Sequence, residues 1–252
     1  MASEMEILAP PSDGVACMRF SQQGNKSHLL PVLACCYGGS DVEAFAGGLE
    51  CALKQVDLNT KQIATVGQHD AAVRNVEYSK EYVGVYDLRN FNHPLEKKES
   101  PLKYQTRCVR VFPDLQGYAM GSIEGRVALE YFGDVTNDDK KRSYAFKCHR
   151  GKVDDQVVIY PVNTIAFHPT FGTFATGGCD GVVNLWDGDN KKRITHLRKF
   201  PTSISALDFN HDGSMLAIAS SYTYEEGEKD HPNDAIFLHS VQTSEVQPKK
   251  KA

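Results

Sequence analysis

The sequence predicts an all-β fold, and three observations between residues 160 and 187 support that prediction. The first apolar run, VNTIAF, stops at His168-Pro169. The second, Thr173–Thr176, leads into two glycines. Asp180-Gly181 then makes a tight turn into the third run, Val182–Asp187, and such a turn between apolar runs indicates a β-hairpin. With 252 residues, 41% of them apolar, the chain can bury the core of one β domain.

The end of this stretch carries the marks of one blade of a WD40-type β-propeller. Asp180 lies in the turn, and the last run closes on Trp186-Asp187, which holds the only tryptophan of the chain. We expect Asp180 to accept hydrogen bonds from nearby backbone groups and Trp186 to pack between neighbouring blades. A fourth mark, a histidine before the first strand, is expected to be missing here because Tyr160-Pro161 stands in its place. His69, in the segment Gly-Gln-His-Asp, carries that mark in another repeat.

The spacing of one aspartate tests how many blades the chain holds. The aspartate that follows a third strand recurs at positions 57, 87, 134 and 187, in steps of 30, 47 and 53 residues. A blade needs roughly 40 to 45 residues, so the first step is too short. We therefore predict an incomplete propeller of about five blade-equivalents. The pattern breaks near Leu33-Ala34 and near residues 80–83, where we place two deletion junctions.

The predicted domain organisation is simple. One propeller domain covers residues 1–241, and a polar, basic and disordered tail covers residues 242–252. The short apolar piece around Met5–Ala9 is expected to complete the last blade, which removes two open sheet edges.

Composition and cysteine spacing exclude several classes of function. A net charge of −4 gives no global positive field for nucleic acid. No long apolar run and no leader pattern are present, so we expect a chain that is neither membrane-spanning nor secreted. The seven cysteines include no CxxC pair, which argues against zinc and disulfide frameworks. We therefore expect no cofactor and no metal.

A catalytic alternative is weak on the same grounds. Cys148 and His149 could be imagined as nucleophile and base, but adjacent residues on a strand point to opposite faces of the sheet. The remaining histidines fall at no ligand spacing, among them His168, His196, His211 and His239. We predict no enzymatic activity and no catalytic residue.

Several strings resemble a known family. LKYQTRCVR (residues 102–110), GSIEGRVALEY (121–131), YAFKCHR (144–150) and PTSISAL (201–207) are similar to the mitotic checkpoint WD-repeat proteins of the budding-uninhibited-by-benzimidazole group. The related mRNA-export WD-repeat family shares the SIEGRVA and FKCHR strings, whereas PTSISAL and NKKR fit the checkpoint branch better. The family's propeller has seven blades, which implies that roughly 25 residues are missing at the first junction and roughly 50 at the second.

The resemblance implies a non-enzymatic adaptor of the spindle assembly checkpoint, in the nucleus, at the kinetochore in mitosis and also in the cytoplasm. In the family, the top face binds GLEBS motifs of checkpoint kinases and phosphorylated kinetochore repeats, without nucleic acid or membrane. By motif position, Arg107 and Arg126 are expected to contact the partner, and Arg19 resembles a phosphate-binding cation. Guanidinium groups grip carboxylates and phosphates through paired hydrogen bonds. The other expected partner-binding residues are Lys103, Tyr104, Lys147 and Arg150.

Three alternatives remain open at this point. The chain could be an mRNA-export adaptor at the nuclear pore, an enzyme that uses Cys148 or the histidines, or a shortened variant that folds poorly and does nothing. The resemblance also leaves ubiquitin binding open.

Overall fold

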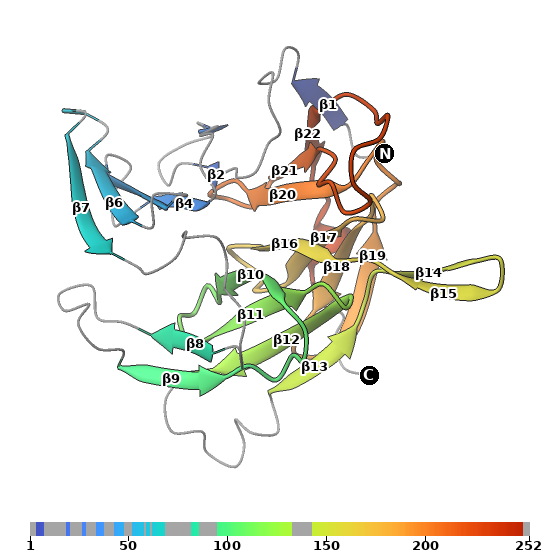
Figure 1. Ribbon diagram of the computed structural model, residues 1–252, viewed down its shortest axis with the longest axis horizontal. Coiled ribbons are helices and arrows are strands. Elements are labelled where there is room, and N and C mark those ends of the chain that lie inside the picture. Colours follow the sequence, from blue (N-terminus) through green and yellow to red (C-terminus); the bar gives the residue numbers. More distant parts are fainter. Residues whose placement is uncertain are drawn as a thin grey trace.

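The computed structural model describes residues 4–7, 19–20, 27–28, 34–37, 43–47, 52–57, 59–60, 62–68, 82–85, 95–132 and 143–248. Within these ranges the chain is all-β and WD40-type, with four antiparallel sheets of four strands each (Figure 1). The first sheet contains β4 (Ala34–Tyr37), β5 (Glu43–Gly47), β6 (Ala52–Asp57) and β7 (Ile63–Gln68). The second contains β10 (Thr106–Val111), β11 (Gly117–Ser122), β12 (Arg126–Tyr131) and β13 (Tyr144–Lys147).

The other two full sheets lie in the C-terminal half. One contains β16 (Val162–Phe167), β17 (Phe174–Gly178), β18 (Val183–Asp187) and β19 (Lys192–His196). The other contains β20 (Ile204–Phe209), β21 (Met215–Ser220), β22 (Ala235–Ser240) and β1 (Glu4–Ile7). Three hairpins have two strands each: β2 (Arg19–Phe20) with β3 (Ser27–His28), β8 (Tyr82–Val85) with β9 (Glu96–Glu99), and β14 (Arg150–Val153) with β15 (Gln156–Ile159). The part of the chain that the structure describes does not close a ring of blades.

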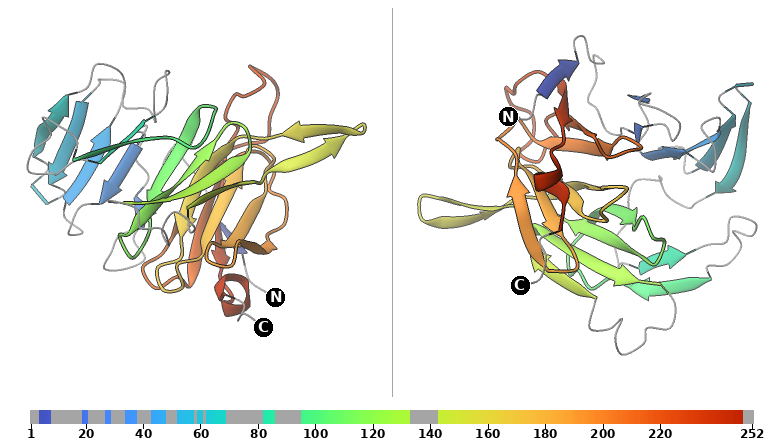
Figure 2. Two further views of the ribbon diagram at one scale, coloured as in Figure 1. Left: turned by 90° about the horizontal axis from the view of Figure 1, so that it is seen from below. Right: turned by 180° about the vertical axis from the view of Figure 1, so that it is seen from behind.

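Neighbouring sheets pack through their first strands. β10 lies against β16, and β16 lies against β20, so the three C-terminal sheets fan out side by side (Figure 2). The residues between them are small or apolar; Ile165, Val183 and Ile204 are fully buried. This packing removes apolar surface from water, and it holds the ends of successive first strands next to one another.

The N-terminal strand completes the last sheet, as the sequence predicts. β1 pairs antiparallel with β22 in the register Glu4 to His239 through Ile7 to Ile236. Two complete four-stranded sheets, β10–β13 and β16–β19, lie between Tyr104 and Ser240.

The turn aspartates confirm one predicted equivalence. Asp57, at the end of β6, accepts hydrogen bonds from the backbone N–H groups of Asn59 and Thr60 at 2.9 Å. Asp187, at the end of β18, accepts one from Asn190 at 3.0 Å in the same way. Both side chains satisfy backbone donors in the turn to the fourth strand. Asp87 and Asp134 lie outside the described residues.

A buried chain of hydrogen bonds corrects the predicted lack of a fourth mark. His149 Nδ1 donates to Asp180 Oδ1 at 2.9 Å, and His149 Nε2 lies 2.8 Å from Thr176 Oγ1. Trp186 Nε1 donates to the same hydroxyl at 2.9 Å, and Asp180 also accepts from the backbone of Val182, as expected. The missing histidine is therefore His149. It was overlooked because the hairpin β14–β15 separates it from β16.

Trp186 packs between sheets, which confirms another prediction. Its ring lies 4.7 Å from that of Phe146 on β13, the outer strand of the neighbouring sheet. Trp186 thus donates a hydrogen bond within its own sheet and makes an aromatic contact with the neighbouring sheet.

The predicted tail begins later than residue 242. The helix α2 (Thr243–Val246) follows β22 directly, and Val246 is buried against the core. Residues 249–252 lie outside the described residues, as do the residues between β7 and β8. The two deletion junctions flank the two-stranded pieces β2–β3 and β8–β9, and their positions stay a prediction.

Candidate partner-binding surface

Strand register brings most of the predicted contact residues to one end of the sheet β10–β13. Thr106 pairs with Ser122, Ser122 with Arg126, and Arg126 with Lys147. These four residues form one row across all four strands. Arg150 follows three residues after Lys147, at the start of β14. We call Arg107, Arg126, Lys147 and Arg150 the basic edge.

Arg107 occupies a β-bulge. The register of β10 and β11 shifts between Thr106 and Cys108, so the strand register skips Arg107. The same shift occurs at Asn163 in β16 and at Ser205 in β20. A bulge redirects its side chain and is common at functional positions. Arg107, Asn163 and Ser205 thus stand in equivalent places on three neighbouring first strands.

The charge of Arg107 acts toward the next sheet. Burial raises the pKa of the Cys179 thiol, and the positive charge of Arg107 is among the influences that oppose this shift. Asn163 donates hydrogen bonds to Cys179 Sγ at 3.2 Å and to the Ile204 carbonyl at 3.0 Å. The bulged residues therefore lie along one end of the packed first strands.

Arg110 belongs to the framework instead. Its Nε donates to the Ile165 carbonyl at 3.1 Å and so joins β10 to β16. Although Arg110 lies in the same sequence string as Arg107, this hydrogen bond fixes it between two sheets.

Glu124 organises the centre of the basic edge. Arg126 Nε lies 4.0 Å from the Glu124 carboxylate, and Arg150 Nη2 donates to the Glu124 carbonyl at 2.8 Å. Arg150 Nε and Glu124 Oε1 are both buried and have no hydrogen-bond partner among the described residues. A buried polar atom without a hydrogen-bond partner costs free energy, so these two atoms lower the stability of this part of the edge.

Exposed apolar and aromatic side chains border the basic edge. Lys103 and Tyr104 precede β10 and are exposed. The hairpin β14–β15 projects from the sheets (Figures 1 and 2) and exposes Val153, Val157 and Ile159. Its two-residue turn, Asp154-Asp155, has positive φ angles of 47° and 61°, as a tight hairpin turn requires.

Two predicted residues are not part of this grouping. Arg19 lies on β2, which contacts β20 rather than the sheet β10–β13, and its side chain is not among those described. His69 lies outside the described residues.

Sequence reasoning missed an aromatic loop on the last sheet. Tyr222, Tyr224 and His231 contact one another, and Tyr224 is 63% exposed. Tyr224 also has a φ of 58°, an unfavourable angle for a bulky residue. A cavity of about 240 Å³ lies beside this loop and next to Asp180. The sequence feature that could have indicated this loop is the string TYEE (residues 223–226), at the start of a long charged segment.

The structure gives Cys148 and His149 no catalytic arrangement. Both residues lie between β13 and β14 rather than on a strand, which corrects the reason given from sequence. Burial raises the pKa of the Cys148 thiol, and both ring nitrogens of His149 face Asp180 and Thr176. Among the described residues no group of side chains could hold a metal ion, and no helix is long and apolar enough to cross a membrane.

The buried thiols give a direct test. Burial raises the pKa of Cys108 to about 12 and that of Cys148 further. We expect iodoacetamide at pH 8 to alkylate both at least about a hundredfold more slowly in the folded chain than in denaturant, because the thiolate is the nucleophile. Mass spectrometry of the two peptides measures this. Rapid alkylation of Cys148 in the folded chain would contradict it.

Comparisons with known proteins agree with this architecture. Residues 141–187 match the family of WD domains described as G-beta repeats. The chain is 40% identical to the mitotic checkpoint protein BUB3.1 of Arabidopsis thaliana, across 98% of this chain and 95% of that protein. It is 45% identical to the mitotic checkpoint protein bub3 of Dictyostelium discoideum, across 87% of this chain and 70% of the relative. It is 28% identical to an mRNA export factor of Xenopus tropicalis, across 98% of this chain and 92% of that protein.

The alignment with the plant protein also bears on chain length. It extends over 327 residues, whereas this chain has 252, so at least 75 aligned positions have no residue here. At 40% identity over nearly the whole of both proteins, the relationship covers the full domain and not one repeat alone. The chain therefore belongs to the Bub3 family of mitotic checkpoint WD40 proteins, which are adaptors and not enzymes.

Proposed function

We propose that this protein binds GLEBS motifs of checkpoint kinases through the basic edge, and phosphorylated kinetochore repeats through the same end of the propeller. The observation that supports this most strongly is the strand register that brings Arg126 and Lys147 to one end of the sheet β10–β13. The bulged Arg107 follows Thr106 of the same row, and Arg150 starts the adjoining strand β14. We place this adaptor in the nucleus and, in mitosis, at the kinetochore; a cytoplasmic pool is also expected.

The chemistry of the basic edge favours an acidic partner. The basic edge has four cations, and the Glu124 carboxylate lies 4.0 Å from Arg126 Nε. Positive charges therefore outnumber negative ones among these five residues, although the whole chain carries −4. Arg107 and Arg126 are partly buried, and screening by solvent is therefore weaker than at a fully exposed site. Arginine also binds a carboxylate through two parallel hydrogen bonds, which fixes its orientation.

The neighbouring apolar groups favour a helical partner with one apolar side. Tyr104 lies beside the basic edge, and the projecting hairpin offers Val153, Val157 and Ile159. An amphipathic acidic helix could set its carboxylates on the cations and its apolar side chains on these groups. A GLEBS segment, acidic and helical, meets both requirements.

The test is a titration with a checkpoint-kinase GLEBS peptide. We expect Arg107→Ala to weaken binding at least about tenfold, equivalent to about 1.4 kcal/mol, because truncation leaves a partner carboxylate unpaired. Arg107→Lys keeps the charge but loses the paired hydrogen bonds, so its affinity should lie between those of the wild-type chain and Arg107→Ala. Lys192→Ala removes an exposed cation at the other end of the neighbouring sheet and should leave affinity unchanged.

Two outcomes would change the proposal. If the wild-type chain and Arg107→Ala bind the GLEBS peptide with equal affinity, Arg107 is only a solvated charge and does not contact the partner. Tighter binding of a nucleoporin GLEBS peptide than of the kinase peptide would favour the mRNA-export role, to which the Xenopus relative belongs by name. Arg19→Ala should weaken only the phosphorylated kinetochore repeat peptide, if this residue pairs with phosphothreonine.

A further inference from the structure

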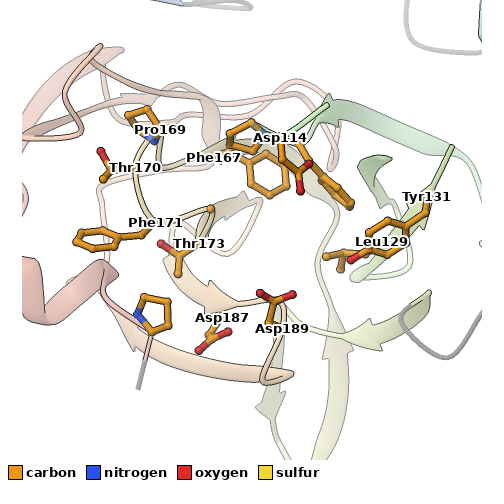
Figure 3. Close-up of a pocket in the computed structure, with 15 residues that line it drawn as sticks. Asp114, Leu129, Tyr131, Phe167, Pro169, Thr170, Phe171, Thr173, Asp187 and Asp189 are labelled. Carbon is orange, nitrogen blue, oxygen red and sulfur yellow. The ribbon is translucent and has the colours of Figure 1, made fainter. Parts of the chain in front are cut away.

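A second cavity lies at the end of the sheets opposite the basic edge. β10 and β12 both start at the basic edge, whereas the cavity is lined by Phe112, Leu129 and Tyr131, at or just beyond their other ends. Phe167 and Asp187, at the far ends of β16 and β18, complete it from the next sheet (Figure 3). Its volume is about 430 Å³, within the range of pockets that hold small ligands or single side chains.

Aromatic rings form much of its wall. The Phe112 ring lies 5.3 Å from that of Tyr131 and 5.4 Å from that of Phe167, both edge-on. The cluster is largely buried and rests on the core between the two sheets, so these rings are held in place. Aromatic faces attract cations, and the attraction is stronger where water is excluded.

Within the part of the chain that the structure describes, all the charged residues that line the cavity are acidic. Asp114 and Asp189 are exposed and lie on opposite sides of it (Figure 3), and the third is Asp187. Asp187 is buried and accepts two hydrogen bonds from Asn190, so its carboxylate serves the turn. The nearby Lys191 directs its ammonium over the Tyr144 ring, 4.5 Å from the centroid. The cavity therefore combines aromatic walls with two carboxylates, and no cation of the described residues lines it.

We propose that this cavity binds the guanidinium group of an arginine side chain from an extended peptide. A planar guanidinium can lie against an aromatic ring and still direct hydrogen bonds toward carboxylates on both sides, which a compact ammonium cannot do equally well. The site lies at the other end of the strands from the proposed GLEBS surface, so the adaptor could hold two partners at once.

The probe is the peptide acetyl-Gly-Arg-Gly-amide, titrated into the full chain and followed by the NMR signals of the Gly172 and Gly188 amides, which line the cavity. The matched peptide contains citrulline, which has nearly the same shape but no charge. We expect the citrulline peptide to bind at least tenfold more weakly. Asp189→Asn should weaken the arginine peptide at least fivefold, and Asp114→Asn should act in the same direction.

The control variant makes the same chemical change elsewhere. Asp155→Asn lies at the hairpin turn, where a φ of 61° suits asparagine, and should leave arginine-peptide affinity unchanged. Equal binding of the two peptides would overturn the proposal, as would equal effects of Asp189→Asn and Asp155→Asn. The GLEBS titration is independent of either result, because it uses residues at the opposite end of the strands.

Discussion

His149→Asn is expected to lower the free energy of unfolding by about 3 kcal/mol, because it breaks a buried hydrogen-bond chain at its centre. The His149 side chain is fully buried, and its ring joins Asp180 to Thr176. Asparagine cannot span both partners, so Asp180 is left in part without its donor. Asparagine does tolerate the φ of 44° that this position requires, so the loss reports the side chain and not backbone strain.

Guanidinium chloride denaturation followed by circular dichroism measures the effect. The matched control is His196→Asn, since His196 is exposed on the outer strand β19 and should change stability by less than about 0.5 kcal/mol. If the two variants unfold at the same denaturant concentration, the hydrogen-bond chain contributes nothing to stability.

Gly177→Ala should destabilise the chain by about 2 to 3 kcal/mol, through a different cause. A Cβ at this position would lie 2.4 Å from Ile204 Cγ2 and 2.9 Å from Thr164 Cγ2. Ile204 is fully buried on β20, so the added methyl group would force two sheets apart. The close approach of β17 to β20 therefore requires glycine.

A double-mutant cycle separates this clash from other effects. Ile204→Ala removes the Cγ2 atom, so Gly177→Ala should cost measurably less in that background, with a coupling of about 1 kcal/mol or more. Gly151→Ala adds a methyl group to the exposed hairpin, where the nearest atom lies 3.6 Å away, and should be nearly neutral. Full additivity of Gly177→Ala and Ile204→Ala would show that the two sites do not meet.

Local sequence signals were enough for the elements of the fold. Asp180-Gly181 gave the β17–β18 turn, and Trp186-Asp187 gave the end of β18 and the contact between sheets. These predictions succeed because turn geometry and strand pairing depend on residues close in the sequence. The family resemblance extended the prediction of WD40-type sheets to the whole chain.

Features that depend on distant residues were not readable in this way. The role of His149 as the fourth WD mark was not predicted, because the hairpin β14–β15 separates it from β16 in the sequence. The string Lys-Cys-His-Arg contains this histidine. The bulge that redirects Arg107 follows from pairing with β11, not from the residues of β10 alone. The aromatic cavity is formed by the ends of strands from two sheets, so no local sequence pattern predicts it.

The pairing of β1 with β22 has a consequence for how the molecule is made. Glu4 leaves the ribosome early but must wait for its partner His239 before it can join a sheet. At translation rates of about 5 to 20 residues per second, that delay is roughly 10 to 50 seconds. Throughout it, β1 remains without its partner strand, because β22 has not yet been synthesised. A nascent-chain stall before residue 235 should therefore leave the N-terminus accessible to protease, and release of the finished chain should protect it.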